Sequence, residues 1–419
     1  MIKKRPHSFI GGAKLLLSTL CLLSATTTNS NVPLLAVAAQ GNGNSNKSDL
    51  SIGNCQAAPQ NKNGNGNGRG RGNRCQAGVD EESSQGGGGG VASGLFGKSF
   101  IEIELDDDFD NPGALKKKVR FDKKEQVLPP TQGDGRPSDG SGSSSLFWYG
   151  ENGMDSFNLL QRGNVAAGSF HMDGIVYQIM SSEDGNSLNV TATKNTDFPP
   201  ELEAEDPDGT ISTRQRSLRS SSSEASSPLN PVNNNRYNSN SYYNNASSSS
   251  TLSSSVRELQ QLQNPVTFDI MVVWTPKAEC NNAGLENSCT RTDSSRAQME
   301  ALIELAVQET NVAFVESGIN AQVRLVHMRP TNYNEGSGWT RTLSDLRGET
   351  DGNMDEVHEL REIYGADMVH VVISQEEYCG IGYFGPRFDR MFGATDWSCM
   401  TGRYTFGHEI GHNMGCHHK

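Results

Sequence analysis

The chain contains 419 residues, of which 34% are hydrophobic, and its formal net charge is −13 at pH 7. Its length allows two or three domains, but the low apolar content means that only part of the chain can bury a hydrophobic core. Because this composition offers no dominant basic surface for phosphate, we expect no nucleic-acid partner.

Residues 1–39 are predicted to be a secretory signal peptide. Lys3, Lys4 and Arg5 precede an apolar run at residues 15–23, which is the order of charge and hydrophobicity found in such signals. The run is too short to span a bilayer comfortably, so we expect no stable membrane span; a retained amphiphilic anchor is the alternative. The protein is therefore expected to be secreted and extracellular.

Two segments have a low-complexity composition. Residues 40–92 are rich in glycine and asparagine, and residues 201–264 are rich in serine and asparagine. Such segments cannot bury enough apolar surface to offset the entropy lost on folding, so we predict a disordered segment and a linker. In the linker, Arg216 and Arg219 have the spacing of a furin-type processing site, while scattered linker arginines are the alternative.

Residues 93–200, between these segments, are predicted to contain several short strands. Apolar and polar residues alternate in SFIEIELD, and LFWYGEN, SFNLLQRG, IVYQIMSS and LNVTAT follow at short spacing. The pattern predicts a small antiparallel β domain.

Residues 265–419 change to alternating strands and helices. Apolar strands are predicted at residues 266–275, 321–328 and 367–374. A long amphipathic helix with Asp293 as its cap follows the first strand, and a second helix ends at Gly365. This βαβαβ order requires a largely parallel sheet with crossover helices.

The eight cysteines indicate an oxidising compartment. Cys21 would leave with the signal peptide, and proximity predicts three disulfides: Cys55 with Cys75, Cys280 with Cys289, and Cys379 with Cys399. Cys416 is then the odd cysteine, and its partner is expected in a C-terminal part of the protein beyond this chain.

The final stretch, HEIGHNMGCHH, is the most specific pattern in the chain. His408 and His412 stand four residues apart, so on a helix their imidazoles leave the same face and can share one metal ion. Gly415 can adopt the left-handed conformation that ends a helix, so that the chain turns and His418 returns as a third ligand. Three nitrogens and an open position are typical of catalytic zinc, and Glu409 lies beside that metal.

The pattern H-E-x-x-H-x-x-G-x-x-H resembles the metzincin clan of zinc endopeptidases, and TFGHEIGHNMG is most similar to its reprolysin or adamalysin branch. The resemblance implies a metzincin-like α/β (α+β) catalytic subdomain with a twisted mixed sheet. It assigns Zn2+ to His408, His412 and His418. His417 is the competing ligand, but it lies one residue short of the family's offset.

The resemblance also extends to other segments. Residues 380–385 would be the edge strand that pairs with an extended substrate, with a plain loop closed by a disulfide as the alternative. Residues 93–200 resemble the β-rich pro-domain that precedes reprolysin catalytic domains, with an unrelated β module as the alternative. Residues 73–80, NRCQAGVD, faintly resemble the cysteine switch of matrix metalloproteinases, which a disulfide between Cys55 and Cys75 would forbid.

This resemblance implies a secreted zinc endopeptidase, made as a zymogen, with its own pro-domain as inhibitor and with protein or peptide substrates. Zinc would polarise the scissile carbonyl and lower the pKa of its bound water toward about 7. Glu409 would accept the proton of that water and pass it to the leaving amine.

Two features depart from the family pattern. Lys419 stands where reprolysins usually carry an aspartate, and the chain ends before the methionine-containing turn that lies beneath the metal in metzincins. We therefore expect a truncated sequence. The alternative function is a secreted, inactive protease-like binding protein or a truncated non-functional product, although the intact Glu409 favours an enzyme.

Overall fold

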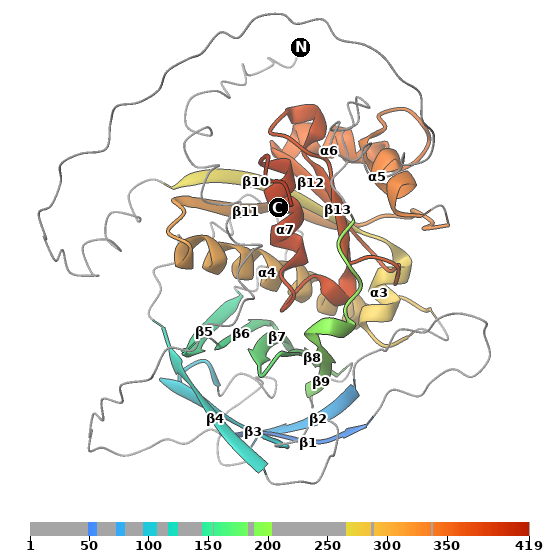
Figure 1. Ribbon diagram of the computed structural model, residues 1–419. Helices are drawn as coiled ribbons and strands as arrows, with labels where there is room; N and C mark the ends of the chain where they lie inside the picture. The colour runs from blue at the N-terminus through green and yellow to red at the C-terminus, as the bar shows by residue number, and fades with distance from the viewer. Residues whose placement is uncertain are drawn as a thin grey trace, which may run out of the picture.

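The computed structural model describes residues 49–56, 73–79, 95–106, 116–124, 145–153, 155–182, 188–202, 265–285, 289–336 and 338–418. They form a β-barrel followed by an α/β unit, with helix α4 (Asp293–Glu316) lying between the two (Figure 1). The predicted signal peptide and the predicted processing site lie outside the described residues.

The barrel closes in the order β1-β2-β9-β8-β7-β6-β5-β4-β3. Neighbouring strands pair antiparallel, except that β1 and β3 pair parallel where the barrel closes. The core is aromatic, since the ring centroid of Phe157 lies 5.5 Å from that of Trp148 and 5.7 Å from that of Phe170. The strands are β1 (Asp49–Gln56), β2 (Asn73–Val79), β3 (Phe100–Asp106), β4 (Lys116–Lys123), β5 (Leu146–Asn152), β6 (Asp155–Arg162), β7 (Val165–Met172), β8 (Ile175–Ser181) and β9 (Leu188–Lys194).

Strands β1 and β2 fall within the Gly/Asn-rich segment whose composition predicts disorder. Main-chain pairing holds these two stretches, because β1 and β2 pair with each other and also with β3 and β9. The composition of a segment indicates how much apolar surface it can bury, but it does not show whether its main chain pairs with neighbouring strands. The predicted disulfide between Cys55 and Cys75 and the predicted cysteine switch depend on side chains that lie outside the described part of the structure.

The α/β unit is built on a five-stranded sheet with the order β11-β10-β12-β14-β13. Strands β10, β11, β12 and β14 pair parallel, and β13 runs antiparallel at the edge. The predicted mixed, largely parallel sheet is therefore confirmed. The strands are β10 (Val266–Trp274), β11 (Ala321–Pro330), β12 (Met368–Ile373), β13 (Gly380–Gly382) and β14 (Phe392–Asp396).

Helices cover both faces of this sheet. On one face, α4 and α7 (Thr405–Asn413) share a buried cluster that includes Val272, Met299, Phe406 and Ile410. On the other face, α5 (Trp339–Arg347) and α6 (Glu356–Tyr364) share a second cluster that includes Val273, Leu343 and Val357. The short helix α3 (Pro276–Asn282) follows β10. None of the helices in the described part of the chain combines the length and apolar character needed to cross a bilayer.

The ends of the helices test two predictions. Helix α4 begins after Thr292, so the prediction that Asp293 caps it is wrong. Thr292 Oγ1 accepts a hydrogen bond from Ser295 N at 3.0 Å, and Ser295 Oγ accepts one from Thr292 N at 2.9 Å. This reciprocal pair leaves Asp293 in the first turn of α4, where its negative charge interacts favourably with the positive end of the helix dipole. Gly365 ends α6 as predicted, with a φ of 65°.

Two of the predicted disulfides are present and are therefore confirmed. Cys280 is bonded to Cys289, and Cys379 to Cys399. The second disulfide joins the start of β13 to the turn that precedes α7. Cys416 is buried and lies outside the disulfides of the described residues.

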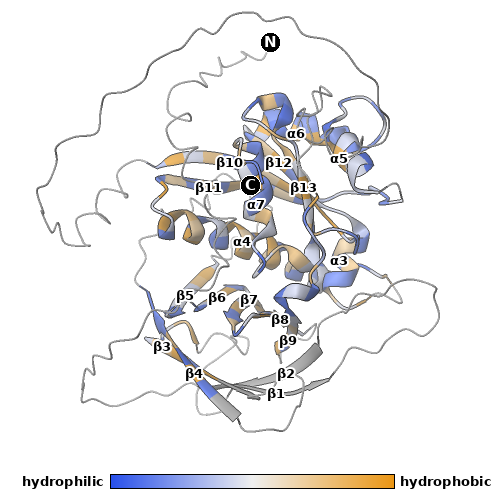
Figure 2. Ribbon diagram, in the orientation of Figure 1, coloured by the Kyte–Doolittle hydropathy of each residue, from blue (hydrophilic) through white to orange (hydrophobic). Residues whose placement is uncertain are grey.

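The barrel docks on the side of α4 that faces away from the sheet. One buried cluster joins the two units and contains Leu160, Val165, Ala167, Ala301 and Leu305. Figure 2 shows apolar residues over much of α4, because one side of the helix packs on the sheet and the other on the barrel. At the border of this contact, Arg162 forms ion pairs with Glu300 at 2.6 Å and with Glu304 at 3.0 Å.

A buried carboxyl group also joins the two units. Glu309 of α4 accepts hydrogen bonds from Ser169 Oγ of the barrel and, at 2.9 Å, from Gly402 N of the turn before α7. Burial raises the pKa of Glu309 to about 7, although both hydrogen bonds act in the opposite direction.

We expect Glu309 to make unfolding pH-dependent. Folding raises the pKa of Glu309 from the ordinary value of 4.5 to about 7. The protonated carboxyl group therefore contributes its full stabilisation below pH 4.5, and this contribution is lost as the pH rises through about 7. Glu309→Gln should remove this component, on the order of 3 kcal/mol, from the pH dependence of denaturant unfolding. The exposed control Glu359→Gln should keep the wild-type pH profile. An unchanged profile in Glu309→Gln would contradict the assignment.

Candidate metal centre

Helix α7 carries the metal-binding pattern. It begins after Tyr404, whose φ of 62° turns the chain into the helix, and it ends at Asn413. Gly415 has a φ of 99°, so the turn predicted at this glycine is present. The turn brings His418 back to the first two histidines, which form one group with it.

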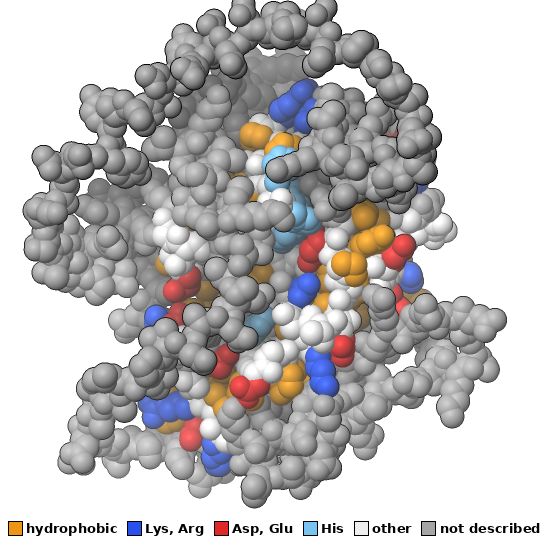
Figure 3. All heavy atoms as spheres, in the orientation of Figure 1, with side chains coloured by type: hydrophobic (Ala, Val, Ile, Leu, Met, Phe, Trp, Pro, Cys, Tyr) orange, Lys and Arg blue, Asp and Glu red, His pale blue; other side chains and the backbone are white. Residues whose placement is uncertain are grey.

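The three predicted ligands converge through their ring nitrogens. His418 Nε2 lies 2.8 Å from His408 Nε2 and 3.1 Å from His412 Nε2. Two nitrogens bound to one tetrahedral zinc at about 2.05 Å would be roughly 3.3 Å apart. The ligand atoms of all three residues lie within 4.8 Å of one another, so the group could hold one zinc ion. Figure 3 shows histidine side chains gathered at the surface where α7 ends in Figure 1.

The protonation of the imidazoles also fits a metal site. His412 Nδ1 lies 2.7 Å from the carbonyl oxygen of Cys416, and an N–H donated there leaves the lone pair of Nε2 available for a metal ion. Burial, followed by the charges of His412 and His418, lowers the pKa of His408 to about 3. His408 is therefore a neutral imidazole at neutral pH, as metal binding requires.

The other histidines lie outside this group. His417, the competing candidate, is exposed and stacks on Phe384 with ring centroids 3.6 Å apart. His370 is buried in β12 and its Nε2 lies 2.7 Å from Thr395 Oγ1. His327 stacks on Tyr364 at a centroid distance of 3.9 Å.

Glu409 lies on the side of α7 that faces the sheet edge. Its side chain is fully buried, at 0% exposure. Two glycines leave room for it: a Cβ on Gly380 would overlap Glu409 Oε1, and one on Gly382 would lie 3.0 Å from Oε2. Burial, followed by the charge of Glu201, raises the pKa of Glu409 well above its ordinary value.

Asn413 fixes the C-terminal end of α7 against the sheet edge, a role that the sequence analysis missed. Its Nδ2 donates hydrogen bonds to the carbonyl oxygens of Tyr383 at 2.8 Å, Phe392 at 3.0 Å and Arg390 at 3.2 Å. A buried asparagine that serves several carbonyls leaves no periodic signal in a sequence, since it acts through its partners in the fold.

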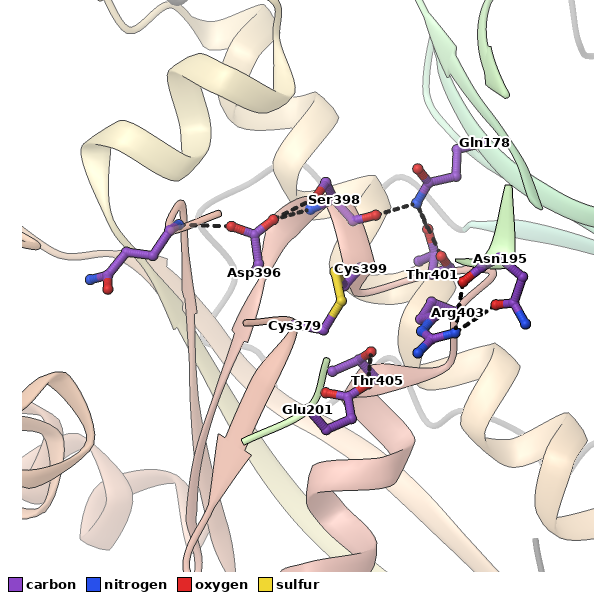
Figure 4. Close-up of a disulfide and its surroundings, with 11 residues drawn as sticks. Gln178, Asn195, Glu201, Cys379, Asp396, Ser398, Cys399, Thr401, Arg403 and Thr405 are labelled. Carbon is purple, nitrogen blue, oxygen red and sulfur yellow. Dashed lines mark hydrogen bonds between the residues drawn. A yellow bond between two sulfur atoms is a disulfide. The ribbon is translucent and has the colours of Figure 1, made fainter. Parts of the chain in front are cut away.

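Two further polar residues beside Glu409 were also missed. Thr405 Oγ1, in the first turn of α7, donates a hydrogen bond to Glu201 Oε1 at 2.9 Å (Figure 4). The sequence places Glu201 at the start of a low-complexity linker, where nothing marks it as part of a site. The edge strand expected at residues 380–385 is present as β13, over Gly380–Gly382.

Residues 299–419 match the family model described as Metallo-peptidase family M12B Reprolysin-like. This part of the chain is similar to the metallopeptidase domains of that family. The resemblance seen in the sequence pattern is thereby confirmed, and the match includes α7, the three histidines and Glu409.

Curated relatives of this domain carry one name, peptidyl-Asp metalloendopeptidase. The chain is 34% identical over 155 residues to such a protein of Stenotrophomonas maltophilia (strain K279a), which covers 37% of this chain and 34% of that protein. A second, from Pseudomonas aeruginosa, is 33% identical over 192 residues, covering 40% and 28% respectively. The chain thus spans about a third of the length of the relatives it matches.

Among solved structures, metalloproteinase-II from Bacteroides fragilis is similar with a TM-score of 0.40 and 12% identity, covering 78% of this chain and 84% of that one.

The geometry of the three imidazoles predicts which histidine binds zinc. His418→Ala should lower zinc affinity by more than roughly 100-fold, because even the loss of a group that only orients a ligand costs about 10- to 100-fold. His417→Ala is the matched control, one residue away, and should retain zinc. Zinc content per chain, measured during competition with a chelator, checks both. Equal losses in the two variants would contradict the assignment.

Proposed function

We propose that this protein is a zinc-dependent endopeptidase and that Glu409 is its general base. The observation that carries the proposal is the convergence of three imidazole nitrogens beside a buried glutamate at the edge strand of the sheet. His408, His412 and His418 would hold the metal.

The proposed chemistry assigns each group a separate task. Zinc held by the three imidazoles would polarise the scissile carbonyl and make the attacking water more acidic. An extended peptide would pair with the outer edge of β13, which lies against Glu409. Glu409 takes a proton from the attacking water and passes it to the leaving amine.

The chain organisation supports a secreted zymogen as the finer proposal. Residues 1–39 would be the signal peptide, residues 93–200 an inhibitory pro-domain, residues 201–264 a linker cut during activation, and residues 265–419 the catalytic domain. Support comes from the disulfides, which suit an oxidising compartment, and from the docking of the barrel on α4 and on the turn before α7.

Glu409→Gln tests the assignment of the base. The variant keeps the shape of the side chain but cannot accept the proton, so hydrolysis of a protein substrate should fall by about 10²- to 10⁴-fold. Zinc content should stay at the wild-type value, because Glu409 is not a ligand. The exposed Glu359→Gln should keep full activity. Wild-type activity in Glu409→Gln would exclude this residue as the base.

A preference for peptide bonds next to aspartate is the finer proposal for the substrate. It is supported by the name that the curated relatives share, and by the positive charge of Arg403 near the Glu201 carboxyl in the site. A peptide with one aspartate should be cut at least about tenfold faster than the same peptide with asparagine, a difference of about 1.4 kcal/mol. Equal rates for the pair would remove the preference and leave the peptidase proposal intact.

A further inference from the structure

The segment that follows the barrel runs along the edge of the candidate site. After β9 and the short turn η3 (Asn195–Asp197), residues 200–202 lie beside β13, where Figure 1 draws them in green. We call these three residues the strap. Cys379 N donates a hydrogen bond to Pro200 O at 3.0 Å, and Leu202 N donates one to Gly380 O at 3.0 Å.

These two bonds use the side of β13 that an extended peptide would need. β13 is the last strand of the sheet, and its other side is occupied by β14. An unpaired strand edge binds a peptide through its main-chain groups, and here the strap takes those groups at the N-terminal end of β13.

The middle residue of the strap projects toward α7. Glu201 Oε1 accepts the hydrogen bond from Thr405 Oγ1 at 2.9 Å, and Thr405 is fully buried at 0% exposure. The Glu201 carboxyl is near enough to Glu409 for the charge of one to act on the other. Arg403 lies close to the same carboxyl and acts on it with the opposite charge. The Glu201 carboxyl therefore lies between the hydroxyl of Thr405, the charge of Arg403 and the carboxyl of Glu409.

Contacts on neighbouring segments fix the position of the strap. Arg403 Nη1 donates to Asn195 Oδ1 at 2.6 Å, which ties the turn before α7 to η3, the segment that leads into the strap. The disulfide between Cys379 and Cys399 joins β13 to that same turn (Figure 4). The barrel is hydrogen-bonded to this turn directly, since Gln178 Nε2 donates to Ser398 O at 2.9 Å and to Thr401 O at 3.0 Å.

We propose that the strap is an internal occupant of the peptide-binding edge and that Glu201 anchors it, so that the carboxyl group of Glu201 fills the space beside Glu409 that the attacking water and the substrate must enter. The inference rests on the proposed peptidase function, and it assigns latency to a carboxyl group held against the general base. The strap is covalently joined to the barrel, so it competes with any external peptide at a high effective concentration.

Loss of Glu201 should therefore open the edge of β13 without loss of the fold. Loss of a hydrogen bond to a charged group should raise the fraction of molecules with a detached strap by roughly 10- to 100-fold. Amide hydrogen exchange at Cys379 and Leu202 should become faster by about this factor in Glu201→Ala. Glu201→Gln, which can still accept from Thr405, should give a smaller increase. These amides report the strap whether or not the protein cuts peptides.

The experiment uses the full chain with Asp197→Asn as the matched control. Asp197 lies in the same segment but is exposed, so its loss of charge should leave exchange at both amides unchanged. Leu202→Pro should also free the outer edge of β13, because it removes the N–H that donates to Gly380 O and leaves Glu201 in place. Near-ultraviolet circular dichroism checks that each variant is folded.

The same variants are tested for cleavage of an added peptide before any cut in the linker. We expect Glu201→Ala and Leu202→Pro to raise the cleavage rate by the factor seen in exchange. Unchanged exchange at both amides in folded Glu201→Ala, together with unchanged exchange at the Cys379 amide in folded Leu202→Pro, would overturn the strap proposal. Wild-type peptide cleavage in that case would leave the peptidase proposal standing. Faster exchange with no cleavage would support the strap and count against the peptidase.

Discussion

The close approach of helix α7 to the edge of the sheet is the constraint on which the site depends. Glycines at positions 380 and 382 place main-chain atoms, and no side chains, opposite Glu409. Asn413 maintains this approach at the other end of the helix through its bonds to three carbonyl oxygens. The distance between the edge that would bind a peptide and the carboxylate that would activate water is therefore set by the backbone, which cannot change rotamer.

The barrel is tied to the same helix. α4 belongs to two hydrophobic clusters, one shared with the sheet and α7 and the other shared with the barrel. The turn before α7 receives hydrogen bonds from Gln178, and Arg403 of that turn binds Asn195. The barrel and η3 therefore contact the segment that leads into α7. A pro-domain that only covered a site would need none of these contacts. Here the barrel, the strap and the turn before α7 form one connected structure.

Local chemistry decided which features could be predicted from the sequence. The spacing of His408 and His412, and the glycine at 415, each act within a few residues, so the motif alone predicts the geometry that is seen. The parallel sheet follows from the order of strands and helices. The prediction of the α4 cap was wrong for a local reason as well. Thr292 and Asp293 are both good caps, and the reciprocal hydrogen bonds with Ser295 select Thr292.

The rest of the site comes from contacts between distant segments. Glu201 reaches Thr405 across 204 positions, and no periodicity or composition relates the two. β1 and β2 are held by pairing with other strands, in a segment where composition predicts disorder. Gly380 and Gly382 did leave a signal, because closely spaced glycines in a short strand indicate a close approach of backbone to another group, but the group itself is identified only by the fold.

X-ray absorption at the zinc edge of the zinc-loaded protein tests the central claim most directly. The account predicts one zinc per chain with three nitrogen neighbours at about 2.0–2.1 Å. A sulfur neighbour at about 2.3 Å, which would place Cys416 on the metal, or a protein that does not bind zinc, would contradict it.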